Sequence, residues 1–317
     1  MNEFDRKSDF HAHVTSFENS DSLLEKARLG NIGSLALIGR GELPDGVESL
    51  IKKANSYGIE IFFGIEDIFS VGGQRKDFII FNVDPSNPEI KNLYGHEKIL
   101  ESSLKVLRKQ IDFLNSQKLF VAGHDEESKT LLEKLLSGQI YEKAINLCKL
   151  ACSNPNNKET LENLWRLYGK TFADQYRDSS FDLSRPTPKF IWWMYFTVGK
   201  HGYFNSERSP EVVAEIIHKT NGLFIFSPES DSPDEEIADV LTNRNYIDGV
   251  MGWHGDRLDI SKKTIKWLRS NGKIILGGSD YNPLRDGEEK QWLLGVGKGD
   301  MFISPERFKR ELRRIKK

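Results

Sequence analysis

Residues 34–66 read SLALIGRGELPDGVESLIKKANSYGIEIFFGIE, and this stretch decides the fold class. Residues 34–38 form a short apolar run of the kind found in buried strands, and residues 59–63 form a second one. A helix is predicted between them, at residues 47–56. Strands that alternate with helices are joined by crossover connections, so this stretch predicts a parallel sheet in an α/β fold.

The same rhythm extends to one more predicted strand, Phe78–Val83, and then stops. Between residues 92 and 201 only helical periodicity is found, which predicts a helical insertion within an α/β domain made of residues 1–91 and 202–317. The helices expected in the insertion span 99–114, 129–136, 141–151 and 160–176. After it come strands at 222–226, 247–251 and 273–276, helices at 211–218, 234–241 and 262–270, and a basic helix from Pro305 onward.

The composition is that of an ordinary globular protein. The chain has 317 residues, 38% of them hydrophobic and 29% charged, and a net charge of -2. This charge gives no basic field for nucleic acid or for an anionic membrane. No apolar run is long enough to span a bilayer, and the first residues lack the apolar stretch of a signal peptide, so we expect a cytoplasmic protein with no membrane partner.

The two cysteines, Cys148 and Cys152, are four residues apart and therefore share one face of a predicted helix. That spacing suits a soft metal or a redox pair, but cysteine is among the most buried residue types, and we interpret both as core residues.

Reactive groups in parallel α/β proteins collect at the carboxyl ends of the strands. Polar or metal-ligand residues follow most of the predicted strands here, namely His11, His13, Arg40, Glu66, Ser227, His254 and Asp280. Two imidazoles spaced as His-x-His on an extended chain lie on one side of it and can hold a single Zn²⁺, Mn²⁺ or Fe²⁺ ion with one or two carboxylates.

The order of these motifs resembles the polymerase and histidinol phosphatase (PHP) family of metal-dependent phosphoesterases, above all its small stand-alone nucleotide phosphoesterases. Asp9-Phe10-His11-Ala12-His13 is similar to the opening motif of the family, and residues 58–66 are similar to the segment that ends in a glutamate ligand. Residues 221–228, 247–250 and 277–282 resemble three later family segments. The resemblance implies a distorted (β/α)7-type PHP barrel with a helical insertion.

Several family ligands are replaced in this chain. The resemblance places Arg40, Lys189, Ser227 and Asn282 at positions where the family has histidine, and Glu18 where many relatives have aspartate. The retained residues, His11, His13, Glu66 and Asp280, surround one of up to three metal positions in the family. The resemblance therefore implies a reduced site for one divalent metal ion, zinc, manganese or iron.

The leading hypothesis is a metal-dependent hydrolase of a small phosphate ester, with a nucleotide as one candidate. Asp280 would accept a proton, Arg40 and Lys189 would bind the phosphate, and His254 would face the substrate. Alternatively, Arg40 and Lys189 form salt bridges with Glu18 or Glu66 in an inactive site. Two rival functions remain open: a catalytically silent PHP-like module that binds a nucleotide or, through the insertion, a protein partner, and a hydrolase of a non-phosphate bond.

Overall fold

The computed structural model describes residues 6–13, 20–43, 47–72, 74–137, 143–177, 182–197, 200, 208–228, 234–242, 244–254 and 260–280. The chain divides into two compact units, one made of residues 1–98 and 208–317 and the other of residues 99–207. These boundaries lie a few residues beyond those expected at 91/92 and 201/202. The first boundary shifts because an unpredicted helix, α3 (Pro88–Tyr94), packs on the first unit beside α9 (Pro210–Lys219).

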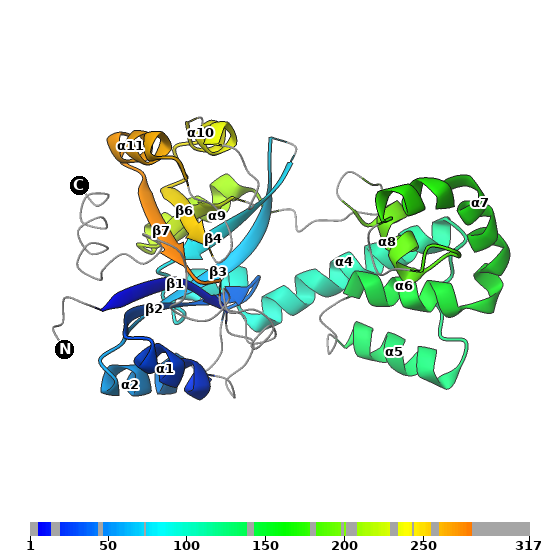
Figure 1. Cartoon of the computed structure of the whole chain (residues 1–317). Coiled ribbons are helices and arrows are strands. Elements are labelled where there is room, and N and C mark those ends of the chain that lie inside the picture. The colour runs from blue at the N-terminus through cyan, green and yellow to red at the C-terminus, as the bar shows by residue number, and fades with distance from the viewer. Residues whose placement is uncertain are drawn as a thin grey trace. The chain divides into compact units, whose positions relative to one another are not determined.

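The first unit is built on one seven-stranded sheet whose strands are neighbours in chain order, and the first and last strands approach each other (Figure 1). The expected α/β barrel is therefore confirmed. Its strands are β1 (Lys7–His13), β2 (Ile32–Arg40), β3 (Glu60–Val71), β4 (Gln74–Phe81), β5 (Leu223–Ser227), β6 (Gly249–His254) and β7 (Ile274–Gly278).

The expectation of a wholly parallel sheet is wrong at β4. This strand pairs antiparallel with both β3 and β5, whereas β1–β2, β2–β3, β5–β6 and β6–β7 are parallel pairs. The cause is local, since β3 continues to Val71 and turns directly into β4 at Gln74. A connection this short can join only antiparallel strands.

Apolar side chains fill the inside of the barrel, including Phe10, Ile38, Ile79, Ile225 and Leu276. The outer face of the sheet is covered by helices: α1 (Ser20–Leu29) packs on β2, α2 (Val47–Ser56) on β3, α9 on β5 and α11 (Lys262–Ser270) on β7 (Figure 1). A further helix of this unit is α10 (Asp234–Thr242).

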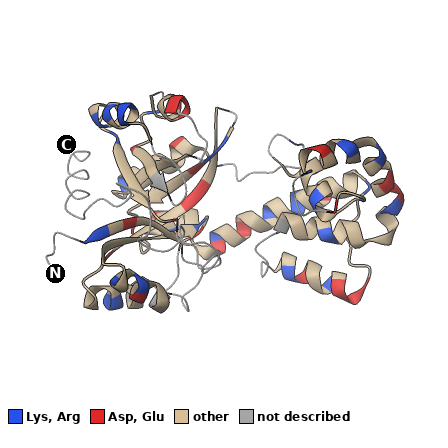
Figure 2. Cartoon of the chain, in the orientation of Figure 1, with Lys and Arg blue, Asp and Glu red and all other residues tan. Residues whose placement is uncertain are grey.

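Helices α10 and α11 carry opposite charges, with acidic residues in the first turn of α10 and basic residues along α11 (Figure 2). The Thr264 hydroxyl of α11 donates a hydrogen bond to Asp234 at the start of α10, 2.8 Å away. This contact joins two neighbouring crossover helices on the outside of the barrel.

The second unit is entirely helical in its described residues and has a hydrophobic core of its own. Asn157 is fully buried there: its side-chain amide donates to the carbonyls of Phe120 and Ala151, and its side-chain oxygen accepts from the Phe120 amide. The helices that form this core are α4 (His96–Ser116), α5 (Glu126–Leu136), α6 (Lys143–Ser153), α7 (Lys158–Gln175) and α8 (Pro188–Tyr195), with a short 3-10 turn at Pro155–Asn157.

The described helices include none that combines the length and the apolar character needed to cross a membrane.

Candidate metal centre

Both histidines of the His-x-His motif lie within β1, not in a loop after it as expected. The pairing with β2 is irregular: Asp9 lies opposite Leu35 and Ala12 opposite Leu37, so β1 advances three residues where β2 advances two. Such a bulge shifts the alternation of side chains by one residue. Phe10, within the irregular stretch, packs in the barrel core, and His13 after it lies beside the inward-facing Ile38.

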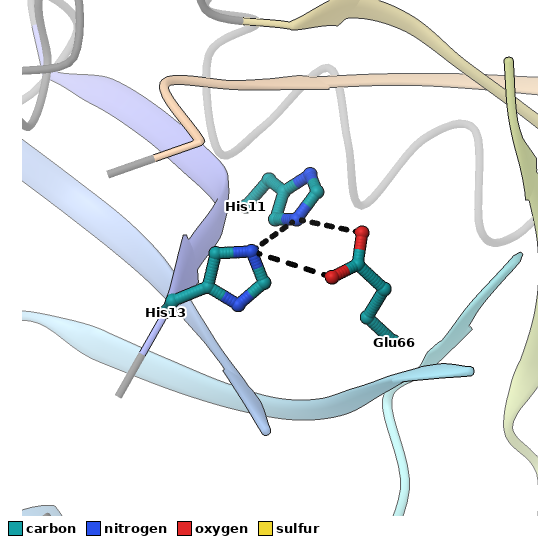
Figure 3. Close-up of side chains that lie close together, drawn as sticks. All are labelled: His11, His13 and Glu66. Atoms are coloured by element: carbon teal, nitrogen blue, oxygen red, sulfur yellow. Dashed lines mark hydrogen bonds and ion pairs between the residues drawn. The ribbon is translucent and has the colours of Figure 1, made fainter. Parts of the chain in front are cut away.

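The imidazoles of His11 and His13 point at each other and at Glu66 of β3, as Figure 3 shows. Their Nε2 atoms are 3.2 Å apart. Glu66 presents one carboxylate oxygen to each ring, 3.9 Å from His11 Nε2 and 3.6 Å from His13 Nε2. Both rings are almost completely buried, while 23% of the Glu66 side chain is exposed.

Asp280 lies two residues after the end of β7, and its side chain extends into the same cluster. Its Oδ1 atom lies 3.0 Å from His13 Nε2 and 3.6 Å from His11 Nε2. Asp280 has a backbone φ of 54°, in the left-handed region that few residues other than glycine, asparagine and aspartate adopt. Backbone strain of this kind concentrates at functional sites, where surrounding structure holds it in place.

The donor atoms of this cluster fit a divalent cation. His13 Nδ1 lies 3.3 Å from the carbonyl of Ile38, and a carbonyl can only accept, so this nitrogen carries the proton of the neutral ring. The Nε2 lone pair of His13 then faces the Asp280 and Glu66 oxygens. Acceptors that converge in this way need a positive charge between them. Ligands around a tetrahedral zinc ion are about 3.3 to 3.5 Å apart, close to the observed separations.

The charge state of Glu66 is set mainly by its environment inside the barrel. Burial raises the pKa of its carboxyl group, and the nearby negative charges of Asp77 and Asp280 raise it further, against the opposing effects of His13 and Arg40. A bound cation would act in the opposite direction and favour the carboxylate.

Asp77 is a charged residue that acts on Glu66 and that the sequence analysis missed. It lies near the start of β4, opposite Ile68 of β3 and Ser227 of β5, and its register places it on the inward face with Ile79. In a parallel sheet, site residues are expected only after strands, because all parallel strands end at the same edge. Since β4 is antiparallel, its first residues lie at the edge where the other strands end. The short β3–β4 connection is the signal that could have found it.

The other predicted site residues fall in several places. Arg40 is exposed at the end of β2, and its backbone lies opposite that of Glu66 in the register between β2 and β3. Ser227 ends β5 and is buried, and His254 ends β6 opposite Gly278, with a side chain outside the described atoms. Lys189 belongs to the helical unit, where its ammonium group lies 3.7 Å from the centre of a Trp192 ring. Glu18 and Asn282, like the helix predicted from Pro305, lie outside the described residues.

The cysteine pair belongs to the core of the helical unit, as interpreted from the sequence. Both residues lie on α6 as free thiols, Cys148 buried and Cys152 partly buried. Burial raises the pKa of the Cys148 thiol well above its usual value and that of Cys152 to about 12. Both thiols are therefore protonated near neutral pH and poor metal ligands or nucleophiles.

Comparison with known proteins reveals similarity in structure but not in sequence. No family profile and no curated protein matches the sequence. A Bifidobacterium adolescentis protein inferred to be a metal-dependent phosphoesterase matches the structure with a TM-score of 0.57 and 15% identity, over 98% of this chain and 96% of the other. The chain has a PHP-like fold.

A second structure supports the same fold assignment. An amidohydrolase from Chromobacterium violaceum, with bound sulfate and no metal, matches with a TM-score of 0.53 and 18% identity over 96% of both chains. The two matches extend over nearly the whole length of each chain, and at these identities they establish the fold alone.

Proposed function

We propose that this protein is a metal-dependent hydrolase that acts on a small phosphate ester, with nucleotides as the first substrates to examine. One observation carries the proposal: His11, His13, Glu66 and Asp280 converge, with each histidine Nε2 atom between 3.0 and 3.9 Å from a carboxylate oxygen of both acids. The shared fold with a protein inferred to be a metal-dependent phosphoesterase supports the reaction class.

The four residues would hold one divalent ion, zinc, manganese or iron, with two imidazole and two carboxylate ligands. When bound, such an ion supplies positive charge that stabilises charge developing on substrate oxygens and makes water more acidic. In the reaction, water adds to phosphorus, the ester P–O bond breaks, and the alcohol leaves with a proton.

The protein's own residues would move this proton and bind the phosphate. Asp280 and Glu66 are the carboxylates placed to accept a proton from water. Arg40 stands beside Glu66 at the end of β2, where its guanidinium group suits two phosphate oxygens. His254 at the end of β6 is the further proposed substrate contact.

A second candidate is the hydrolysis of a carbon–nitrogen or carboxyl bond. The amidohydrolase match favours it, and a site with one metal ion suits that reaction as well. A third candidate, a silent module that binds a nucleotide or a protein partner, follows from the replacement of ligands at Arg40 and Ser227.

Three measurements on the purified full-length chain separate these candidates. The first is the metal content of the protein as isolated and after incubation with Mn²⁺ or Zn²⁺. The second is phosphate release from a mixed panel of nucleotides, and the third is amine release from a panel of amides. We expect about one metal ion per chain, phosphate release, and loss of that release in Asp280→Ala.

The outcomes point in different directions. A chain that takes up no metal on titration would contradict the metal site and favour the silent module. A metal-loaded chain that cleaves amides and releases no phosphate would replace the phosphoesterase by the second candidate.

A further inference from the structure

Asp9 is a fully buried acidic residue on β1, two residues before the first histidine of the cluster. One oxygen of its side chain, Oδ1, accepts two backbone hydrogen bonds. The first comes from the N–H group of Ser279, 2.9 Å away, and the second from the N–H group of His11, 3.3 Å away. A single carboxylate oxygen thus joins the segment that carries His11 to the residue that precedes Asp280.

This connection lies where the barrel has to close. Hydrogen-bonded pairing runs from β1 through to β7 in chain order, and the ladders among the described strands include none between β7 and β1. The two strands nevertheless meet closely. A Cβ atom built on Gly278 would lie 2.3 Å from the His11 nitrogen and 2.5 Å from the His11 Cβ, so only glycine allows this approach.

The close approach places two ligands from opposite ends of the barrel domain in one cluster. His11 comes from the first strand, and Asp280 follows the last described strand, yet their side chains are 3.6 Å apart. Hydrogen bonds from backbone N–H groups to a carboxylate are stronger than those between neutral groups, and here both partners are buried. Asp9 therefore has the geometry to fix the distance between the two strands.

We propose that Asp9 is a positioning residue for the metal centre, which holds His11 and Asp280 in register through their backbones and is not itself a ligand. This inference rests on the proposed metal site. Groups behind metal ligands that fix the ligand orientation typically change metal affinity by about 10- to 100-fold when they are removed. At the seam between β1 and β7, Asp9 acts on the backbone of one ligand and on the residue before another.

The test is a titration of the full-length chain with Co²⁺, whose visible absorption reports both affinity and coordination geometry. Asp9→Ala removes the acceptor, and we expect about 10- to 100-fold weaker Co²⁺ binding with an altered spectrum. Asp9→Asn retains a side-chain oxygen that accepts both N–H groups, so we expect it to bind Co²⁺ nearly as the wild type does. Rescue by this variant would separate hydrogen bonding from general packing.

Asp248 provides the matched control. Its carboxylate likewise accepts a backbone hydrogen bond in the same barrel, from the Phe224 N–H group at 2.7 Å, and among the described residues it makes no contact with the cluster. We expect Asp248→Ala to lower thermal stability and to leave the affinity for Co²⁺ unchanged. Gly278→Ala offers a second route if Asp9→Ala fails to fold, because a methyl group there would displace His11 while Asp9 stays intact.

Wild-type Co²⁺ affinity and spectrum in Asp9→Ala, with a loss of stability like that of Asp248→Ala, would overturn the positioning role and leave the metal site standing. Wild-type binding in Gly278→Ala would overturn it as well. A wild-type chain that binds no Co²⁺ would overturn both the metal site and the inference built on it.

Discussion

Asp280 Oδ1 lies 3.0 Å from His13 Nε2, so the second residue after the last described strand contacts the end of the first strand. Because His13 Nδ1 faces the Ile38 carbonyl, the nitrogen that faces Asp280 is the unprotonated one in the neutral ring. Two acceptors at this distance repel each other unless a proton or a metal ion lies between them.

Replacing His13 by alanine should abolish stoichiometric metal binding, because it removes one of the two rings that contact both carboxylates, the one closer to them. We expect the affinity for Mn²⁺ or Zn²⁺ to fall by more than about 100-fold, beyond the usual effect of residues behind the ligands. Elemental analysis after gel filtration and a metal titration would measure it. His124→Ala, in the helical unit, is the control and should keep its metal; equal metal content in both variants would contradict the assignment of His13 as a ligand.

Arg40→Ala should raise KM for a phosphorylated substrate about tenfold or more and change kcat less. A hydrogen bond to a charged group contributes about 1.5 to 3 kcal/mol, and Arg40 would make it in the ground state as well as in the transition state. Steady-state kinetics on the metal-loaded enzyme would test this. Arg28→Ala, which removes an exposed arginine paired with Glu25 on α1, should leave KM unchanged. An unchanged KM in Arg40→Ala would remove the phosphate-binding role.

Tyr94→Phe should destabilise the barrel unit by about 1.5 to 3 kcal/mol. The Tyr94 hydroxyl donates a 3.0 Å hydrogen bond to Asp67, whose carboxylate also pairs with Arg208, and Tyr94 is fully buried. Burial already raises the pKa of the Asp67 carboxyl group, so loss of a donor would leave it poorly compensated.

Urea unfolding followed by fluorescence would measure the effect of Tyr94→Phe. Tyr168→Phe, at an exposed position of the helical unit, serves as the comparison and should change stability by less than about 0.5 kcal/mol. Equal stabilities of the two variants would show that the hydrogen bond to Asp67 contributes nothing.

The stabilising effect of His218 should depend on pH. Its Nε2 atom is 2.8 Å from Asp248, and this hydrogen bond, together with the negative charge of Asp248, raises the pKa of His218 against the opposing effect of burial. A raised pKa means that the contribution is fully present below the unfolded-state pKa of about 6.5 and is lost as pH rises through the folded-state pKa.

His218→Gln should therefore cost more stability at about pH 5.5 than at about pH 9, by less than about 1 kcal/mol, since solvent screens a side chain that is more than one third exposed. Urea unfolding at both pH values would measure the difference. Asp248→Asn should abolish the same pH dependence. A cost that is equal at both pH values would show that the pair does not titrate in this range.

The alternation of apolar strands with helices could be recognised in the sequence because it is a local pattern. Residues 34–38 and 222–226 became β2 and β5 with small shifts at their ends, and the helical periodicity of residues 160–176 became α7. The types of the candidate ligands could also be recognised in the sequence, because imidazoles and carboxylates are chemically suited to metal. The structure brings His11, His13, Glu66 and Asp280 together.

Strand direction and side-chain facing depended on tertiary structure. The direction of β4 is decided by the short connection between Val71 and Gln74 and by the pairing of β4 with β5 on its other side. The antiparallel direction places Asp77 at the edge of the sheet where Glu66 and the other candidate ligands lie. Likewise, the bulge in β1 exists only in its pairing with β2, and it turns Phe10 and His13 to the same side.

The sequence by itself determined the α/β class, the helical insertion and the chemical identity of the side chains proposed to bind metal, because periodicity and residue type are properties of neighbouring residues. Only the tertiary structure decided how these side chains meet. The distance between His11 and Asp280 depends on the closure of β7 against β1, on the absence of a side chain at Gly278 and on the Asp9 hydrogen bond to Ser279. These are contacts between segments far apart in the chain, which no local pattern encodes.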